Sequence, residues 1–388
     1  MIGLRTIAEV CFWVAAALIV YVYLGYPLLL ALLSLFKRPV RAPLGYTPAL
    51  SVLIAAYNEE EAIAKKIAQT LALDYPPDKL DILVLSDCST DQTDAMVRGV
   101  GDPRVRLLRM SQRGGKTRAQ NEGVKHARGE VLVFSDATTV YHPKALAYLA
   151  CNYQDPAIGA VSGRYQYFDS EGNSPTGMGT IMFWNYENMI KVLQSRLRTI
   201  TGCCGCIYSV RKAAYTGLAD DVISDLVQPL QVIRKGYRVR FEDRALAYEE
   251  TTRSTAEEFS MRVRVVTRAM RGLLSVPDLL KPWKFAWTSF QLISHKVLRW
   301  MVPLFLLLLF AASAALAAQP GWYRIPFLLQ GVFYLSALLT ALVPLHRKFK
   351  PLGVPLYFCT LNAAALFSVV EVLRGRKYVV WQTVRNQS

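Results

Sequence analysis

Polar clusters that contain carboxylates follow three short apolar runs of the sequence. The runs have the length of strands and occupy residues 51–56, 80–85 and 130–134. The clusters after them contain Glu59, Asp87 and Asp136, respectively. Strands that alternate with helices form parallel sheets, whose carboxyl ends meet at one crevice. One aspartate after a strand is usually a turn former or a helix cap, but three clusters together predict a binding site.

The side chains of these clusters suit a ligand that carries a nucleobase and a diphosphate. One carboxylate can accept hydrogen bonds from the base, and a second can hold a divalent cation on the diphosphate. Asp87 and Asp136 suit these two roles. The segment Gly114-Gly115-Lys116 adds a glycine pair beside a lysine, which can meet phosphate or the edge of a base. Its spacing does not match the Walker sequence, which excludes a P-loop.

Cysteine spacing predicts buried thiols rather than a metal site. The seven cysteines stand at positions 11, 88, 151, 203, 204, 206 and 359. Three of them crowd one short stretch, but no second Cys/His pair stands at the spacing of a zinc site. We therefore expect reduced cysteines in a cytoplasmic domain.

The composition indicates a membrane protein with one soluble domain. Hydrophobic residues make up 53% of the 388 residues, and the net charge is +16, from 45 Lys and Arg against 29 Asp and Glu. The apolar excess lies in the first forty and last hundred residues, whereas residues 49–271 have a mixed composition. Beside membrane spans, such a basic surplus favours contacts with anionic lipid on the cytoplasmic side over nucleic acid, so no nucleic acid partner is expected.

Four segments are long and apolar enough to cross a bilayer, since a helix rises about 1.5 Å per residue and the hydrocarbon is about 30 Å thick. They occupy residues 10–35, 301–318, 325–345 and, more weakly, 351–373. Lys37, Arg38 and Arg41 place the end of the first span in the cytoplasm. A full crossing by the fourth would put the basic tail outside, against the charge rule, and a re-entrant segment would remove this conflict.

These patterns divide the chain and define its fold class. We expect an α/β, Rossmann-like domain with a mainly parallel sheet, one N-terminal span, about three C-terminal spans and an amphipathic interfacial helix rich in Trp and Lys. An ordinary domain helix remains the alternative for the interfacial segment. The predicted parts are residues 1–41, the soluble domain 42–275, the interfacial region 276–298, the C-terminal spans 299–375 and the basic tail 376–388.

The ordered motifs resemble family 2 glycosyltransferases of the GT-A fold, in the membrane-bound bacterial exopolysaccharide branch related to cellulose, chitin and hyaluronan synthases. The resemblance runs from the first span to Trp381. Each motif is weak alone, but their order and spacing together are specific. The motifs are Ala56-Tyr57-Asn58-Glu59, Ser86-Asp87 with Ser89-Thr90-Asp91, Gly115-Lys116 with Asn121, Asp136-Ala137, residues 202–211, and Ser224-Asp225 with Gly236.

The resemblance implies a role for each matching residue. It places Ala56, Tyr57 and Glu59 in the nucleotide pocket, Asp87 on the uracil or ribose, and Lys116 near the base. It makes Asp136 the ligand of Mg²⁺ or Mn²⁺ and Asp225 the general base that deprotonates an acceptor hydroxyl. A single displacement would then invert the anomeric centre. Glu249, which we expect just after the last domain strand, has either a structural or a functional role.

Two departures from the family pattern bear on the product. Thr138 stands where the family's metal motif often has a second aspartate, which leaves Asp136 as the single clear ligand. The Gln-x-x-Arg-Trp motif of processive synthases is absent from residues 261–265, which removes an aromatic platform for the acceptor. Arg262, Arg264 and Arg268 can still clamp the diphosphate, or they form a basic face at the membrane.

The resemblance thus implies an inverting transferase in the inner membrane, with its catalytic domain in the cytoplasm. Its expected donor is a UDP-sugar, and its expected acceptor is lipid-linked or a glycan. Membrane lipid, a second copy of the chain and polysaccharide-assembly proteins are further expected partners. Two alternatives stay open: a processive β-glycan synthase that translocates its polymer, and a non-catalytic membrane scaffold or transporter.

Overall fold

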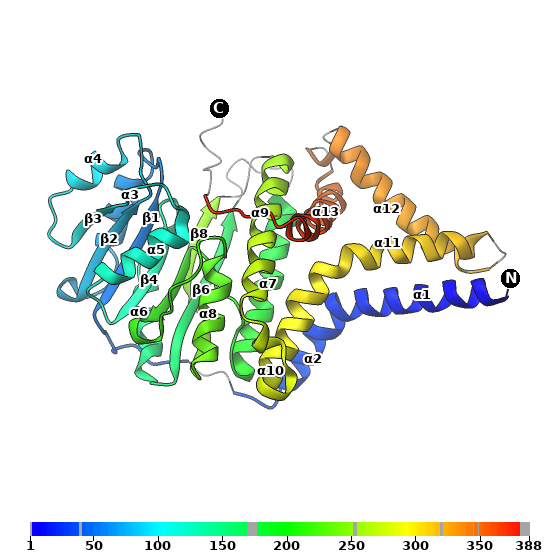
Figure 1. The fold of residues 1–388 in the computed structure, drawn as a ribbon, viewed down its shortest axis with the longest axis horizontal. Coiled ribbons are helices and arrows are strands. Elements are labelled where there is room, and N and C mark those ends of the chain that lie inside the picture. The colour runs from blue at the N-terminus through cyan, green and yellow to red at the C-terminus, as the bar shows by residue number, and fades with distance from the viewer. Residues whose placement is uncertain are drawn as a thin grey trace.

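The computed structural model describes residues 2–38, 41–168, 177–250, 254–318, 321–343, 345–347 and 349–380. A single twisted sheet of eight strands forms the centre of the α/β domain (Figure 1). The strand order is β3-β2-β1-β4-β7-β6-β8-β5. The strands are β1 (Leu50–Ala56), β2 (Leu80–Ser86), β3 (Val105–Arg109), β4 (Val131–Asp136), β5 (Val140–Tyr141), β6 (Ile158–Phe168), β7 (Ile207–Arg211) and β8 (Arg238–Glu250).

The three strands predicted from apolar runs are confirmed as β1, β2 and β4, and they pair in parallel. Ala56 lies opposite Ser86, and Ala55 lies opposite Asp136. Their carboxyl ends are therefore level, which brings the polar clusters to one edge of the sheet. The sheet is mixed, because β7 runs antiparallel to both β4 and β6, while β6 pairs in parallel with β8.

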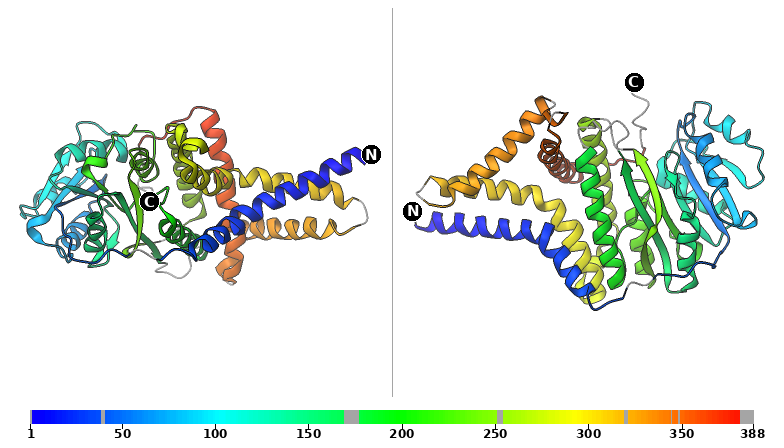
Figure 2. Two further views of the ribbon diagram at one scale, coloured as in Figure 1. Left: turned by 90° about the horizontal axis from the view of Figure 1, so that it is seen from below. Right: turned by 180° about the vertical axis from the view of Figure 1, so that it is seen from behind.

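Helices cover both faces of this sheet (Figures 1 and 2). All seven residues of β1 are buried, as expected for a central strand covered on both sides. The helices of the domain are α3 (Ile63–Leu71), α4 (Thr93–Arg98), α5 (Gly115–His126), α6 (Ala145–Ala150), α7 (Gly177–Leu197), α8 (Ser224–Arg234) and α9 (Thr255–Leu274).

Four helices in the described part of the chain are long and apolar enough to cross a membrane, as the sequence predicts: Gly3–Ser34, Pro282–Ala317, Arg324–Leu342 and Lys350–Leu373. One is N-terminal and three are C-terminal. Leu28, Leu328 and Val332 on these helices are each more than 60% exposed, which suits contact with lipid. In Figure 1 the N-terminal helix (α1, Ile2–Val20, and α2, Tyr26–Ser34) runs beside α11 (Leu298–Ala317) and away from the sheet.

The predicted interfacial segment is continuous with the first C-terminal span. Helix α10 (Pro282–Leu292) leads through one π-helical turn, η6 (Ile293–Val297), directly into α11, so no loop separates them. The π turn places Lys296 and His295 at the junction between the α/β domain and the apolar helices. Gln291 donates a hydrogen bond of 3.0 Å to the carbonyl of Thr199, which ties this segment to the domain.

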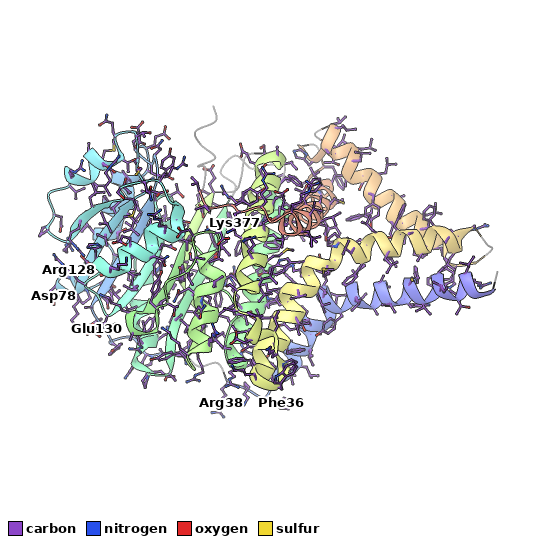
Figure 3. The ribbon with its side chains drawn as sticks, viewed as in Figure 1. Phe36, Arg38, Asp78, Arg128, Glu130 and Lys377 are labelled. Atoms are coloured by element: carbon purple, nitrogen blue, oxygen red, sulfur yellow. The ribbon has the colours of Figure 1, made fainter. Side chains whose placement is uncertain are left out.

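The last long helix, α13 (Gly353–Leu373), runs across the other apolar helices and packs against α9 and α7 of the α/β domain (Figure 2). The chain after it returns to the domain, because the carbonyl of Val379 lies against Gly115 at the start of α5. Arg38 and Lys377 both lie on the side of the α/β domain (Figure 3). The described part of the tail, up to Val380, therefore lies on the same side of the apolar helices as the α/β domain.

Candidate active site

The loops after β1 and β2 meet, as their strand ends predict. The side-chain oxygen of Asn58 accepts a hydrogen bond of 2.8 Å from the backbone N–H of Thr90. The backbone N–H of Glu59 donates to the Thr93 hydroxyl at 2.8 Å, and the Glu59 side chain lines the main cavity. The guanidinium of Arg113 lies 3.6 Å from the ring centroid of Tyr57, which adds a third loop to this wall.

Asp87 holds the glycine loop in place. Its side chain is fully buried, and its two carboxylate oxygens accept hydrogen bonds from the backbone N–H groups of Gly114 at 2.8 Å and Gly115 at 2.9 Å. Gly115 has φ +83°, a conformation that side chains rarely adopt. The structure thus brings Asp87 beside the Gly114–Lys116 segment but leaves Ala56, Tyr57 and Asp87 outside the lining of the main cavity.

Lys116 and Asp136 form an ion pair at the sheet edge. Lys116 lies in the first turn of α5, and Asp136 ends β4, so the pair joins two of the clusters singled out in the sequence. Burial lowers the pKa of Lys116, but the charge and hydrogen bond of Asp136, together with more distant negative groups that include Asp225, leave the net pKa raised. A firmly charged lysine beside a carboxylate in a cavity suits phosphate binding.

Asp225 lies in the first turn of α8 and lines the same cavity as Lys116 and Asp136. A Cβ atom on Gly205 would lie 2.7 Å from a carboxylate oxygen of Asp225, so in this conformation the Asp225 carboxylate packs directly over Gly205. Burial raises the pKa of Asp225 above its ordinary value, while Lys116 and Lys191 partly oppose that rise. A carboxylate with a raised pKa is a better proton acceptor when ionised, as a general base requires.

Glu249 supplies a second carboxylate beside Asp136. It is the penultimate residue of β8, which corrects our expectation that it follows the last strand, because β8 extends to Glu250. The Thr138 hydroxyl donates to Glu249 at 3.2 Å, and the Tyr165 hydroxyl also donates to it. Burial, and next the charge of Asp136, raise the pKa of Glu249.

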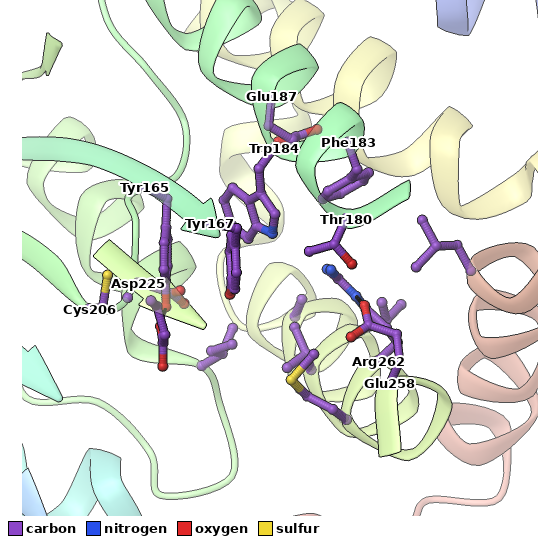
Figure 4. A pocket seen from close by; sticks show the side chains of 18 of the residues that line it. Tyr165, Tyr167, Thr180, Phe183, Trp184, Glu187, Cys206, Asp225, Glu258 and Arg262 are labelled. Carbon is purple, nitrogen blue, oxygen red and sulfur yellow. Dashed lines mark hydrogen bonds and ion pairs between the residues drawn. The ribbon is translucent and has the colours of Figure 1, made fainter. Parts of the chain in front are cut away.

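Three aromatic rings form one wall of the cavity near Asp225 (Figure 4). The rings of Tyr165 and Tyr167 stack with centroids 4.8 Å apart and planes 11° apart. Trp184, from α7, lies 4.9 Å from Tyr165 and 5.8 Å from Tyr167. Our sequence interpretation missed this wall because its members come from β6 and α7, not from the expected motif near the membrane.

The three arginines of α9 divide between two sites. Arg268 donates 2.8 Å to the Thr117 hydroxyl, next to Lys116, and 2.6 Å to the carbonyl of Val222. Arg262 instead pairs with Glu258 at 2.7 Å and donates to the Tyr357 hydroxyl at 3.1 Å. All three arginines, Arg264 included, line the cavity. Arg262, however, lies at the end of the cavity that α13 forms, because it donates to Tyr357. The structure therefore does not bring them together as one clamp.

The three clustered cysteines are buried and free, as the sequence predicts. Cys203, Cys204 and Cys206 are buried and form no disulfide. Within the described residues, no group of three or more His, Cys, Asp or Glu side chains could hold a metal ion by itself. A metal bound in this cavity would thus need ligands from substrate or water in addition to protein carboxylates.

One cavity of about 1450 Å³ connects these groups to the apolar helices. Asp136, Asp225 and Glu249 line one part of it, and Tyr23, Tyr357 and Phe358 from the N-terminal helix and α13 line another. Between them lie Glu187 on α7 and the cations Lys191, Lys296 and Arg299. The α/β domain and the long apolar helices therefore both line this cavity.

Residues 51–218 match the protein family described as "Glycosyl transferase family 2". Poly-beta-1,6-N-acetyl-D-glucosamine synthase of Staphylococcus aureus (strain COL) is 26% identical over 247 residues, which are 59% of this chain and 58% of that protein. An N-acetylglucosaminyltransferase of Mesorhizobium japonicum (strain LMG 29417 / CECT 9101 / MAFF 303099) is 25% identical over 252 residues, 60% of this chain and 59% of that protein. The matched regions thus span less than two thirds of these curated relatives.

The fold also occurs in a protein of known structure. A mannosyltransferase from Pyrobaculum calidifontis, solved in complex with GDP-Man and Mn²⁺, superposes with a TM-score of 0.73 at 24% identity and covers 95% of this chain and 100% of its own. The sheet order, the strand-end clusters and these similarities agree. The chain therefore carries a family 2 glycosyltransferase domain of the GT-A fold.

Proposed function

We propose that the protein transfers a sugar, with inversion, from a UDP-sugar to an acceptor used in cell-surface polysaccharide synthesis. One observation carries this proposal: Asp225, at the start of α8, shares a cavity with Lys116 and Asp136 at the strand ends. The relatives named as N-acetylglucosaminyltransferase and poly-N-acetylglucosamine synthase support UDP-GlcNAc as the first donor to test. UDP-glucose is the second.

The donor would bind at the ends of β1, β2 and β4. Tyr57 and Arg113 form one wall for the nucleotide, and Asp87 keeps the amides of Gly114 and Gly115 in position. Lys116 and Arg268, which donates to the hydroxyl of the neighbouring Thr117, would both face the diphosphate. In this proposal Asp87 contacts the base directly, as the family resemblance implies. It also fixes the Gly114–Gly115 loop, which then contacts the base.

The carboxylates at this edge fit a divalent cation. Mg²⁺ and Mn²⁺ prefer oxygen ligands and often bind through one or two carboxylates together with substrate phosphates. Asp136 and Glu249 are those carboxylates here, with the Thr138 hydroxyl between them. When bound, the cation would neutralise charge on the diphosphate leaving group. Lys116, now paired with Asp136, would turn to the phosphate as the donor enters.

Asp225 would perform the proton transfer. Its carboxylate takes the proton of the acceptor hydroxyl as that oxygen attacks the anomeric carbon. The bond from this carbon to the diphosphate oxygen breaks on the opposite side, and its electron pair leaves with the nucleotide. The aromatic wall of Tyr167 and Trp184 would stack on the acceptor sugar, since apolar sugar faces pack on aromatic rings.

The aromatic wall also supports a second candidate, the processive synthase. Loss of the Gln-x-x-Arg-Trp motif argues for a single transfer, but Trp184 and Tyr167 provide a platform for a growing chain from other elements. We take single transfer as the main proposal.

The described tail lies on the same side as the α/β domain and carries basic residues, which supports a cytoplasmic catalytic domain in the inner membrane.

The test uses purified full-length protein, radiolabelled UDP-GlcNAc or UDP-glucose, Mn²⁺ and membrane extract as the source of acceptor. Asp225→Asn should abolish transfer and retain UDP binding, whereas Asp78→Asn, an exposed aspartate far from the cavity (Figure 3), should have no effect. Full activity of Asp225→Asn would refute the assignment. The size of the labelled product separates a single transfer from polymerisation.

A further inference from the structure

A buried lysine lies behind the carboxylate edge of the site. Lys66 belongs to α3, which packs against β5, and it is only 3% exposed. It does not line the cavity, so it does not contact a substrate bound there. Lysine is rarely buried unless its charge has a partner. The site described above gives Lys66 no role.

Lys66 holds the turn that follows β4. Its ammonium group donates a hydrogen bond of 2.6 Å to the carbonyl of Thr139 and lies 3.9 Å from the ring centroid of Tyr141. One turn later in the same helix, Gln69 donates to the carbonyl of Tyr141 at 2.6 Å. Helix α3 therefore fixes the segment that begins at Asp136, the last residue of β4.

The same segment is joined to the carboxylate of the other strand. β5 pairs with β8, so that Tyr141 lies opposite Ala247. Glu249 follows two positions along β8 and accepts a hydrogen bond from the Thr138 hydroxyl at 3.2 Å. Lys66 thus supports, through one turn, the segment that connects both carboxylates of the proposed metal edge.

The charge of Lys66 also acts on these carboxylates. Burial lowers the pKa of Lys66 to about 7, while Cys206, Asp136 and Glu249 oppose that change. Lys66 makes no ion pair at contact distance with the residues that the structure describes, so the carboxylates act on it through space. Such interactions are strong in a buried site, because little water lies between the groups. Near pH 6 the amine is protonated, and its positive charge reaches the metal edge.

Two lysines therefore flank this edge with different freedom. Lys116 pairs with Asp136 from the side of the cavity and would turn to the phosphate as the donor enters. Lys66 cannot follow it, because Thr139 and Tyr141 enclose its ammonium group. A divalent cation that takes the place of Lys116 would still meet one fixed positive charge. Like charges repel, so this charge weakens the binding of the cation.

We propose that Lys66 is a positioning residue of the metal edge: it fixes the turn after Asp136, and its charge limits how tightly the edge holds a divalent cation. This inference rests on the proposed transferase function and concerns the metal of the same site. The weaker hold favours departure of the metal together with the nucleotide diphosphate after each transfer.

The test measures Mn²⁺ binding to the full-length protein, with UDP present and at about pH 6, by electron paramagnetic resonance of free Mn²⁺. Lys66→Gln keeps a donor for the carbonyl of Thr139 but loses the charge, so half saturation should need about tenfold less Mn²⁺. Lys66→Arg keeps the charge and should bind Mn²⁺ as the wild type does. Lys65→Gln removes an exposed charge from the neighbouring position and should change nothing.

The sign of the change separates charge from structural support. If Lys66 only supported the turn, its loss would displace Asp136 and weaken Mn²⁺ binding, so weaker or unchanged binding by Lys66→Gln would overturn the inference. For a variant of lower stability, the rise in the thermal unfolding midpoint on addition of Mn²⁺ and UDP gives the same comparison, and it should be larger in Lys66→Gln than in the wild type. Wild-type protein that binds no Mn²⁺ with UDP would instead refute the metal edge of the proposed transferase.

Discussion

The Thr138 hydroxyl lies 3.2 Å from a carboxylate oxygen of Glu249, although 111 residues separate them in the chain. The contact joins the loop after β4 to the end of β8. It places a carboxylate beside Asp136 at the position where the sequence has threonine instead of a second aspartate. In the proposed metal site, Glu249 would therefore take the place of the missing second aspartate.

Glu249→Gln should weaken metal binding. The amide keeps the shape and one acceptor but loses the charge that attracts a divalent cation, so we expect about a tenfold rise in the Mn²⁺ concentration needed for half saturation. Electron paramagnetic resonance of free Mn²⁺, with UDP present, measures this directly. Thr138→Asp in the Glu249→Gln background should recover affinity, and Glu122→Gln, a partly exposed carboxylate of α5 outside the lining of the cavity, is the control. Unchanged affinity in Glu249→Gln would remove Glu249 from the site.

Trp184→Ala should impair use of the acceptor but not of the donor. Removal of the indole deletes one face of the Tyr165–Tyr167–Trp184 wall. An aromatic contact contributes about 0.5–1.5 kcal/mol beyond area burial, so the acceptor concentration for half-maximal transfer should rise about tenfold. Trp184→Phe should retain most function. Trp283, which is 82% exposed on α10, provides the control Trp283→Ala. An unaltered acceptor dependence would show that the wall has no such role.

The activity should fall on the acidic side at a higher pH than an ordinary aspartate would allow. Burial raises the pKa of Asp225, and the base must be ionised, so kcat/KM decreases as the pH falls through this raised pKa. Lys191 lowers that pKa, so Lys191→Gln should move the acidic limb to higher pH, and Lys191→Arg should leave it in place. A pH profile of donor hydrolysis without acceptor measures the limb. An identical pH profile for Lys191→Gln would show that the acidic limb does not report the ionisation of Asp225.

Gly129→Ala should destabilise the α/β domain. A Cβ atom at Gly129 would lie 2.4 Å from the backbone nitrogen of Ser51 and 2.5 Å from the carbonyl carbon of Leu50. These are main-chain atoms of a central strand and cannot move aside, so overpacking should cost about 1–3 kcal/mol. Thermal unfolding of the solubilised protein measures the loss. Gly217→Ala, whose nearest neighbour atom would be 3.9 Å away, should leave the midpoint unchanged. Equal midpoints for both variants would contradict the prediction.

The sequence predicted those elements whose pattern is local. β1, β2 and β4 are apolar runs because parallel central strands are buried on both faces, and the four candidate spans stand out by their length and apolar composition alone. β3 was not predicted, and the strand expected before Glu249 is longer than predicted, because β8 runs to Glu250. Both strands mix charged and apolar residues, and β8 is only partly buried, so its 13 residues become a strand through pairing with β6.

The sequence alone determined the fold class, the four apolar helices and the residues Lys116, Asp136 and Asp225, because each belongs to a motif read from neighbouring positions. Only the tertiary structure decided the position of Glu249 beside Thr138, the aromatic wall and the grouping of Lys191, Lys296 and Arg299 in one cavity. The physical reason is the same in each case. These groups come from elements far apart in the chain, and only strand pairing and helix packing place their charges and rings within contact distance.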